Sequence, residues 1–88
     1  MNFGTYIIQK LNELKTTRAK FVSKTGIGNS GVNRWRRGQQ PRVDTFVISC
    51  EVIARLSGEP FECVILDGLK SLPSYRSAVE RFEQVSGK

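Results

Sequence analysis

Apolar residues recur at intervals of three and four along most of this chain, which is the spacing of one face of an α-helix. Between residues 43 and 56 many of them are β-branched, but the alternation of period two that marks a half-buried strand is missing. The sequence therefore predicts an all-α fold. The spacing predicts five to six short helices, over residues 2–15, 18–25, 30–37, 43–56, 59–69 and 74–86.

Residues that typically begin and end helices lie between these segments. Thr16 or Thr17 is suited to cap helix 18–25, and Asn29 or Ser30 is suited to cap helix 30–37. The other signals are Gly26, Gly38 and Gly58 after helix ends, Asp44 in a first turn, Pro60 at a first helical position, Pro73 as a helix breaker and Ser74 as a cap.

The inward-facing positions of these helices define the predicted core. Helix 30–37 buries Val32 and Trp35, which lie three residues apart, and helix 43–56 is predicted to be central and mostly buried. The other inward positions are Phe3, Tyr6, Ile7, Lys10, Leu11 and Leu14, then Phe21, Val22 and Ile27, then Val43, Phe46, Val47, Ile48, Cys50, Val52, Ile53, Ala54 and Leu56, and finally Phe61, Val64, Ile65 and Leu69.

The last predicted helix carries a thin apolar stripe on an otherwise polar segment. Such a stripe packs either on its own domain or on a second copy of the chain, and both interpretations stay open at this point. The chain therefore divides into a domain over residues 1–72 and a C-terminal helix over 73–88 for packing or dimerisation. The stripe consists of Tyr75, Ala78, Val79, Phe82 and Val85.

The two cysteines lie in apolar stretches, FVISCEVIA and FECVILDGL. The spacing of Cys50 and Cys63 fits neither a zinc site nor a disulfide framework, so we expect two reduced core thiols in a cytoplasmic protein. No signal peptide, transmembrane span or lipidation motif is visible. No metal or cofactor signature is present, so we expect no cofactor.

Basic residues are concentrated in one third of the chain. The formal net charge is +6, and residues 15–42 hold eight bases and no acid, whereas the remainder has six bases against eight acids. A basic zone on a slightly acidic domain is typical of a face that binds a polyanion. A solvated lysine-rich surface would normally include glutamates, which this zone lacks. The basic residues of the zone are Lys15, Arg18, Lys20, Lys24, Arg34, Arg36, Arg37 and Arg42.

A short helix, a glycine turn and a second short helix with an arginine-rich outer face follow the order of a helix-turn-helix motif. The segments RAKFVSKTGIGNSGVNRWRRGQQP and VDTFVISCEVIARLSG resemble the phage Cro/repressor helix-turn-helix family, also called the XRE type. The NRWRRGQQP segment also resembles phage lambda-type early transcription activators. The resemblance covers residues 3–69 and implies a lambda repressor-like fold. The positions that match the family pattern are Val22, Gly26, Ile27, Val32, Trp35, Gly38 and Pro41.

Three residues depart from the family pattern. Arg18 stands where the family often has a glutamine that contacts phosphate, and Arg36 replaces a common glutamate, so both changes add positive charge. Gly31 lies within the recognition helix, where it alters the expected base-reading register by up to one residue.

The resemblance implies that helix 30–37 enters the major groove of duplex DNA with its N-terminal side chains nearest the base edges. The predicted base-reading residues are Asn29, Ser30, Asn33 and Arg34. Arginine pairs with O6 and N7 of guanine, and asparagine pairs with N6 and N7 of adenine. A phosphate contact is the alternative for Arg34, and a helix cap is the alternative for Asn29. The predicted phosphate contacts are Arg18, Lys24, Arg37, Gln39, Gln40 and Arg42, whereas Arg36 stays unassigned.

Trp35 has two possible roles. A tryptophan among arginines can stack on exposed bases of single-stranded nucleic acid. However, Val32 shares its face, and Phe21 and Phe46 are expected nearby, so a core position is favoured.

The sequence therefore predicts a sequence-specific transcriptional regulator that binds double-stranded DNA, of the phage or mobile-element repressor kind. One such domain reads few base pairs, so a homodimer on an inverted-repeat operator is expected, with repression or activation left open. An enzyme is not expected, because the chain has no histidine and no recognisable catalytic constellation. The alternatives are an antitoxin-type autoregulator that binds a toxin partner and a small RNA-binding protein. A membrane-surface module is disfavoured, because the bases do not follow one amphipathic helix.

Overall fold

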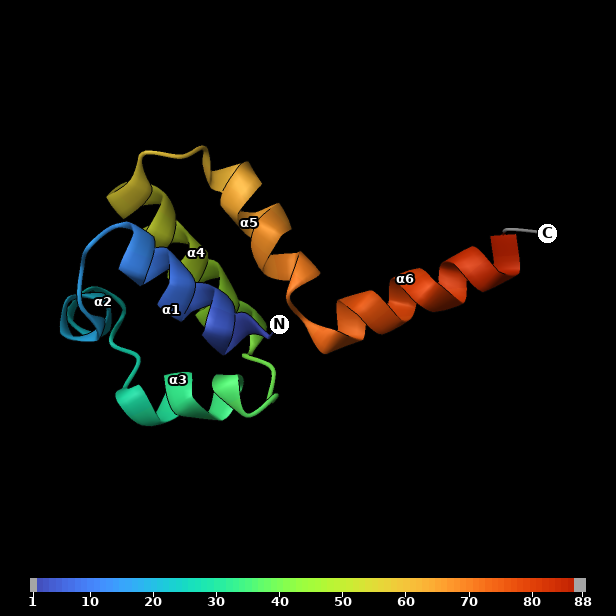
Figure 1. The fold of residues 1–88 in the computed structure, drawn as a ribbon, viewed down its shortest axis with the longest axis horizontal. Helices are drawn as coiled ribbons and strands as arrows, with labels where there is room; N and C mark the ends of the chain where they lie inside the picture. The colour runs from blue at the N-terminus through green and yellow to red at the C-terminus, as the bar shows by residue number, and fades with distance from the viewer. Residues whose placement is uncertain (1, 87–88) are drawn as a thin grey trace.

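The computed structural model describes residues 2–86, which form six α-helices and no strand (Figure 1). The predicted all-α fold class is confirmed, with a helix-turn-helix in the second and third helices. Within the described residues no helix is both long enough and apolar enough to cross a membrane. The helices are α1 (Phe3–Glu13), α2 (Arg18–Thr25), α3 (Asn29–Arg36), α4 (Val43–Ser57), α5 (Phe61–Lys70) and α6 (Pro73–Ser86).

The helix-turn-helix begins and ends at residues suited to those positions. The Thr17 hydroxyl accepts a hydrogen bond from the Lys20 backbone N–H at 3.2 Å and so caps α2. Gly26 follows α2 with a φ of 76°, a left-handed conformation that glycine adopts without steric cost. The N-cap of α3 is Gly28, so the prediction that Asn29 or Ser30 caps this helix is wrong. Both residues lie in the first turn instead.

The first residues of the last two helices also differ from the prediction. Pro60 precedes α5 and serves as its N-cap residue, because the helix begins at Phe61. Pro73 is the first residue of α6, where its missing N–H leaves no hydrogen bond unmade. Ser74 therefore lies inside the helix and is not its cap. Its backbone N–H donates a hydrogen bond to Oε1 of Gln40 at 2.7 Å.

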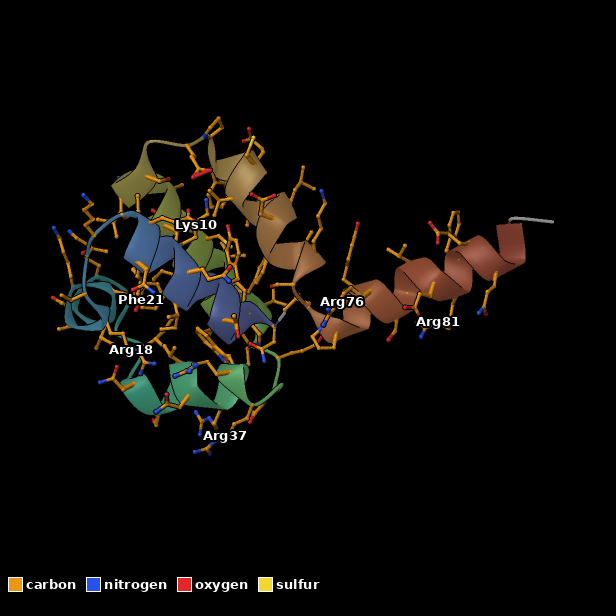
Figure 2. The ribbon with its side chains drawn as sticks, viewed as in Figure 1. Lys10, Arg18, Phe21, Arg37, Arg76 and Arg81 are labelled. Carbon is orange, nitrogen blue, oxygen red and sulfur yellow. The ribbon has the colours of Figure 1, made fainter. Side chains whose placement is uncertain are left out.

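The core is built around α1 and α4. α4 contacts α1, α2 and α5, and α1 also contacts α3. The Phe3 ring lies 5.2 Å from the Trp35 ring and 5.0 Å from the Phe46 ring, measured between centroids. Trp35 is only 5% exposed, which confirms its predicted core position. Phe21 of α2 is fully buried against the same cluster (Figure 2).

α4 is buried on one side only, contrary to the prediction for several of its residues. Its three neighbouring helices contact one side, so Val43 is 80% exposed, and Val47 and Ile48 are also exposed. An apolar pattern that runs most of the way around a helix cannot show which side a small domain leaves uncovered.

The two cysteines have different environments. Cys50 is buried, and this burial raises the pKa of its thiol to about 12, so the thiolate does not form at neutral pH. Cys63 is exposed, so the prediction that both thiols belong to the core is wrong for this residue. It lies on the outer side of α5, whose buried residues are Val64 and Gly68. Ile65 and Leu69 also pack on the core, whereas Phe61, predicted to face inward, is exposed.

α6 projects from the body formed by α1–α5 (Figure 1). The molecule measures 47 × 27 × 22 Å, and α6 accounts for its long axis. Tyr75 is 37% exposed and Phe82 is 71% exposed, so the predicted stripe does not form part of the domain's own core. The side chain of Val85 and residues 1, 87 and 88 lie outside the described part of the chain.

Candidate nucleic-acid interface

α3 lies at the edge of the body and presents one side to solvent. Gly31, Val32 and Trp35 are buried on its inner side. The four predicted base-reading residues therefore lie on the outer side, where three are exposed and Asn33 is half-buried. We call this side the α3 outer face; it consists of Asn29, Ser30, Asn33, Arg34 and Arg37.

Gly31 supports the turn of the motif and takes no part in the outer face. A Cβ atom at this position would lie 3.2 Å from Cγ2 of Ile27, a tight contact across the turn. The missing side chain therefore lets Ile27 pack on the first turn of α3. Gly31 lies on the buried side of α3, so it does not displace any of the predicted base-reading residues. The helix begins one residue earlier than the sequence predicted.

Two hollows flank the α3 outer face. The first lies between α3 and the loop before α4, and Ser30 and Arg34 line it. Three predicted phosphate contacts line the same hollow: Gln39, Gln40 and Arg42. The second hollow lies on the α1 side and is lined by Thr5, Asn33, Arg36 and Arg37. The fold thus gathers most of the predicted site residues around one helix, and Arg37 points outward from its end (Figure 2).

Arg18 links the first helix of the motif to the second. Its Nη1 atom donates a hydrogen bond to Oδ1 of Asn33 at 3.3 Å, from a half-buried position at the start of α2 (Figure 2). Because a guanidinium has only donors, this contact fixes which atom of the amide faces Arg18. The Nδ2 donors of Asn33 are then directed away from Arg18.

The charges near α3 are almost all positive. Arg34, Arg36 and Arg37 form no ion pair within the described residues. Arg42 is the exception, because its Nε atom lies 3.8 Å from Oδ1 of Asp44, although both side chains are well exposed. Exposed ion pairs of this kind contribute little to stability, so Arg42 can exchange Asp44 for another anion.

Of the predicted phosphate contacts, Gln40 also contacts α6, and Lys24 lies away from the α3 outer face. Oε1 of Gln40 accepts the hydrogen bond from Ser74, while its amide donors remain available for an anion. Lys24 is not brought to the α3 outer face. It lines a groove with Ile48, Glu51, Val52, Arg55 and Leu56 on the α4 side of α2.

The residues that hold the C-terminal end of α3 were not predicted from the sequence. Asn2 caps α1 by accepting the Thr5 N–H at 2.9 Å, and its Nδ2 donates to the Arg36 carbonyl at 2.7 Å. Gly4 lies against the backbone of Arg36, and an added Cβ would come within 2.8 Å of its Cα atom. An asparagine before a helix is a recognisable cap, but its second contact, 34 residues away, has no local signal.

Comparison with protein-family models, with curated proteins and with solved structures found no match for this chain. The assignment of a function therefore depends on the geometry and charge of the α3 outer face.

Proposed function

We propose that the chain is a transcriptional regulator that binds double-stranded DNA, with α3 in the major groove. The observation that carries this proposal is the position of α3. Trp35 anchors the helix in the core, while four polar side chains of types that can hydrogen-bond to base edges lie on its outer side. An α-helix with its side chains is about 10–12 Å in diameter, which fits a major groove about 12 Å wide.

The flanking hollows support the same docking. A helix in the groove has one DNA strand on each side, and the two hollows carry arginine and amide donors on each side of α3. Arg37 and Arg42 would contact phosphates on opposite strands and so position α3 without reading the sequence. Arg34 would read a guanine through its two parallel donors.

Burial of Trp35 favours duplex DNA over single strands. Proteins that bind single-stranded nucleic acid stack bases on exposed aromatic rings. The ring of Trp35 lies in the core instead, and the α3 outer face has no aromatic side chain. This face therefore suits the edges of stacked base pairs better than the faces of unstacked bases.

Replacing Arg34 with alanine tests the reading role. We expect affinity for the duplex preferred by the unmodified protein to fall about 5- to 150-fold, the effect of ~1–3 kcal/mol for one bidentate base contact. We also expect preference at one base pair to relax. Fluorescence anisotropy on duplexes that vary at each position measures both quantities.

The matched control is Lys70→Ala, which removes one positive charge from the exposed side of α5. Its affinity is expected to stay within about twofold, because Lys70 lies outside the α3 outer face and its charge is screened. An Arg34→Ala protein that loses affinity equally for all sequences would assign Arg34 to a phosphate and contradict the reading role.

A further inference from the structure

The hollow on the α1 side of α3 collects polar side chains from two helices. We call it the α1–α3 hollow; Thr5 lines it from α1, and Asn33, Arg36 and Arg37 line it from the C-terminal half of α3 and its end. The sequence left Arg36 unassigned and gave no role to Thr5. The fold therefore brings together two residues that local sequence patterns do not connect.

The main chain of Arg36 is fixed against the first turn of α1. Its carbonyl oxygen accepts the hydrogen bond from Nδ2 of Asn2 at 2.7 Å. A Cβ atom added at Gly4 would lie 2.8 Å from Cα of Arg36 and 2.6 Å from its Cγ, distances that real side chains essentially never show. Glycine at position 4 thus lets both the main chain and the side-chain stem of Arg36 lie against α1. The guanidinium starts from a fixed base beside the hollow.

The helices on both sides of the hollow have no carboxylate near it. α3 contains none, and the one carboxylate of α1 belongs to Glu13, the last residue of the helix, about 12 Å along the axis from Thr5. Arg36 and Arg37 are exposed and form no ion pair within residues 2–86. The α1–α3 hollow therefore presents two positive charges that the molecule does not neutralise.

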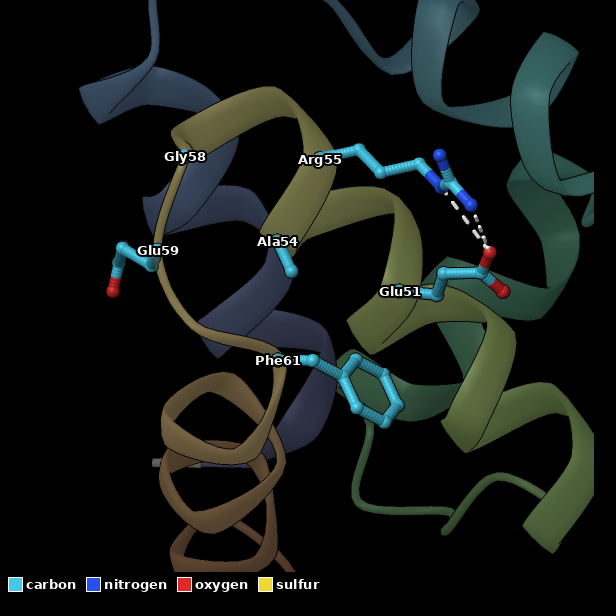
Figure 3. Close-up of a pocket in the computed structure, with 6 residues that line it drawn as sticks. All are labelled: Glu51, Ala54, Arg55, Gly58, Glu59 and Phe61. Atoms are coloured by element: carbon cyan, nitrogen blue, oxygen red, sulfur yellow. Dashed lines mark hydrogen bonds and ion pairs between the residues drawn. The ribbon is translucent and has the colours of Figure 1, made fainter.

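The pocket between α4 and α5 has a different charge balance (Figure 3). Its Glu51 pairs with Arg55 at 2.9 Å. Its other carboxylate, Glu59, pairs with Lys10 of α1 at 2.9 Å. The ionic groups of this pocket already have partners within the molecule. Charge therefore favours the α1–α3 hollow as the place for an external anion.

The Thr5 hydroxyl can become a donor to such an anion. It donates to Oδ1 of Asn2 at 3.0 Å, but the same oxygen also accepts the Thr5 backbone N–H at 2.9 Å. A hydroxyl hydrogen rotates to suit its surroundings. Turning it toward the hollow leaves Asn2 with its backbone hydrogen bond, so no buried group loses its last partner.

Arg36 and Arg34 lie on opposite flanks of α3. Two residues along a helix are separated by about 200° around its axis. Arg34 accordingly lines the hollow beside the loop before α4, whereas Arg36 lines the α1–α3 hollow. With α3 in the major groove, the base edges face its outer side and the two strand backbones lie along its flanks. Arg36 is therefore directed at a backbone and away from the base edges.

We propose that the α1–α3 hollow binds one backbone phosphate of the DNA strand on the α1 side, held by the Arg36 guanidinium and the Thr5 hydroxyl. The inference rests on the proposed function, because it needs α3 to lie in the major groove. It makes α1 part of the interface, together with the two helices of the helix-turn-helix. Such a contact positions α3 on the duplex and reads no sequence.

Fluorescence anisotropy of the complete chain on labelled duplexes of two unrelated sequences tests the site. We expect Arg36→Ala to bind both duplexes about tenfold more weakly, the effect of losing one charged hydrogen-bonded contact. We also expect the slope of log affinity against log salt to lose about one unit of magnitude. Lys70→Ala is the matched control, since it removes the same charge from an exposed position of α5 and should leave the slope unchanged.

Thr5→Val separates the hydroxyl from the charge. Valine has nearly the shape of threonine, so this variant removes the hydroxyl and keeps every arginine. We expect affinity to fall about fivefold on both duplexes with an unchanged salt slope, because the lost donor is neutral. Far-UV circular dichroism verifies that both variants are folded.

Neutral methylphosphonate linkages, placed one at a time along the duplex that the unmodified protein prefers, locate the phosphate. One linkage should weaken binding of the unmodified protein and have no further effect on Arg36→Ala, which shows that the two are in contact. An Arg36→Ala protein that keeps its affinity and slope, or that loses affinity for one sequence only, would overturn the site while the proposed function stands. Failure of the unmodified protein to bind any duplex would overturn both.

Discussion

Replacing Trp35 with alanine is expected to lower the free energy of unfolding by about 3–5 kcal/mol, the usual effect of removing a large buried aromatic side chain. Trp35 is 5% exposed and packs on Phe3, which in turn packs on Phe46. The substitution therefore leaves a cavity between α1, α3 and α4. For a domain of this size it removes much of a total stability of roughly 5–15 kcal/mol.

Urea unfolding followed by circular dichroism measures this effect. Fluorescence is unsuitable, because Trp35 is the only tryptophan in the chain. Trp35→Phe is the matched control. It keeps an aromatic ring in the core, so it should lower the free energy of unfolding by less than the alanine substitution does. An alanine variant as stable as the unmodified protein would show that the ring does not anchor α3, and would remove the main support for the proposed docking.

The affinity for duplex DNA is expected to fall at least about 50-fold when monovalent salt rises from roughly 50 to 200 mM. The charged phosphate contacts that the fold leaves near α3 are Arg18, Arg37 and Arg42, and about three neutralised phosphates give a slope near −3 for log affinity against log salt, to which the site at Arg36 would add about one. The physical cause is the release of condensed counterions when arginines and lysines replace them on the DNA backbone.

Single substitutions separate the phosphate contacts from other basic residues. Arg37→Ala is expected to reduce the magnitude of the slope by about one while leaving the sequence preference unchanged. Lys24→Ala tests the residue that the fold holds apart from α3, and an unchanged slope is expected, because Lys24 lines the groove beside α4. A slope near zero for the unmodified protein would contradict binding through the phosphate backbone.

The sequence predicted those parts of the fold that depend on local spacing and local chemistry. Val32 and Trp35 lie three residues apart, which defined the inner side of α3 and hence its polar outer side. Gly26 and Thr17 defined the turn and the start of α2, because a left-handed glycine and a capping threonine act within a few residues. The base-reading roles proposed for the four outer side chains came from the resemblance to the helix-turn-helix family; the spacing predicted only that they face outward.

Features that depend on contacts between distant segments could not be predicted from the sequence. The direction of α6 depends on Ser74 and Gln40, which are 34 residues apart. Gly4 resembles any other glycine in a helix until α3 is packed against it. Similarly, Val43 and Val47 have the same apolar character as the buried residues of α4, and only the arrangement of the other helices leaves them exposed. Tertiary packing decided each of these cases.

The proposed function requires that the α3 outer face read base pairs in duplex DNA. Selection of binding sites from a random duplex library at roughly 0.15 M salt tests it most directly, because nonspecific attraction is partly screened there. We expect recovery of a defined short sequence, arranged as half-sites about one helical turn apart if a dimer binds. Recovery of no sequence above background, from a protein shown to be folded, would contradict the base-reading roles of Asn29, Ser30, Asn33 and Arg34.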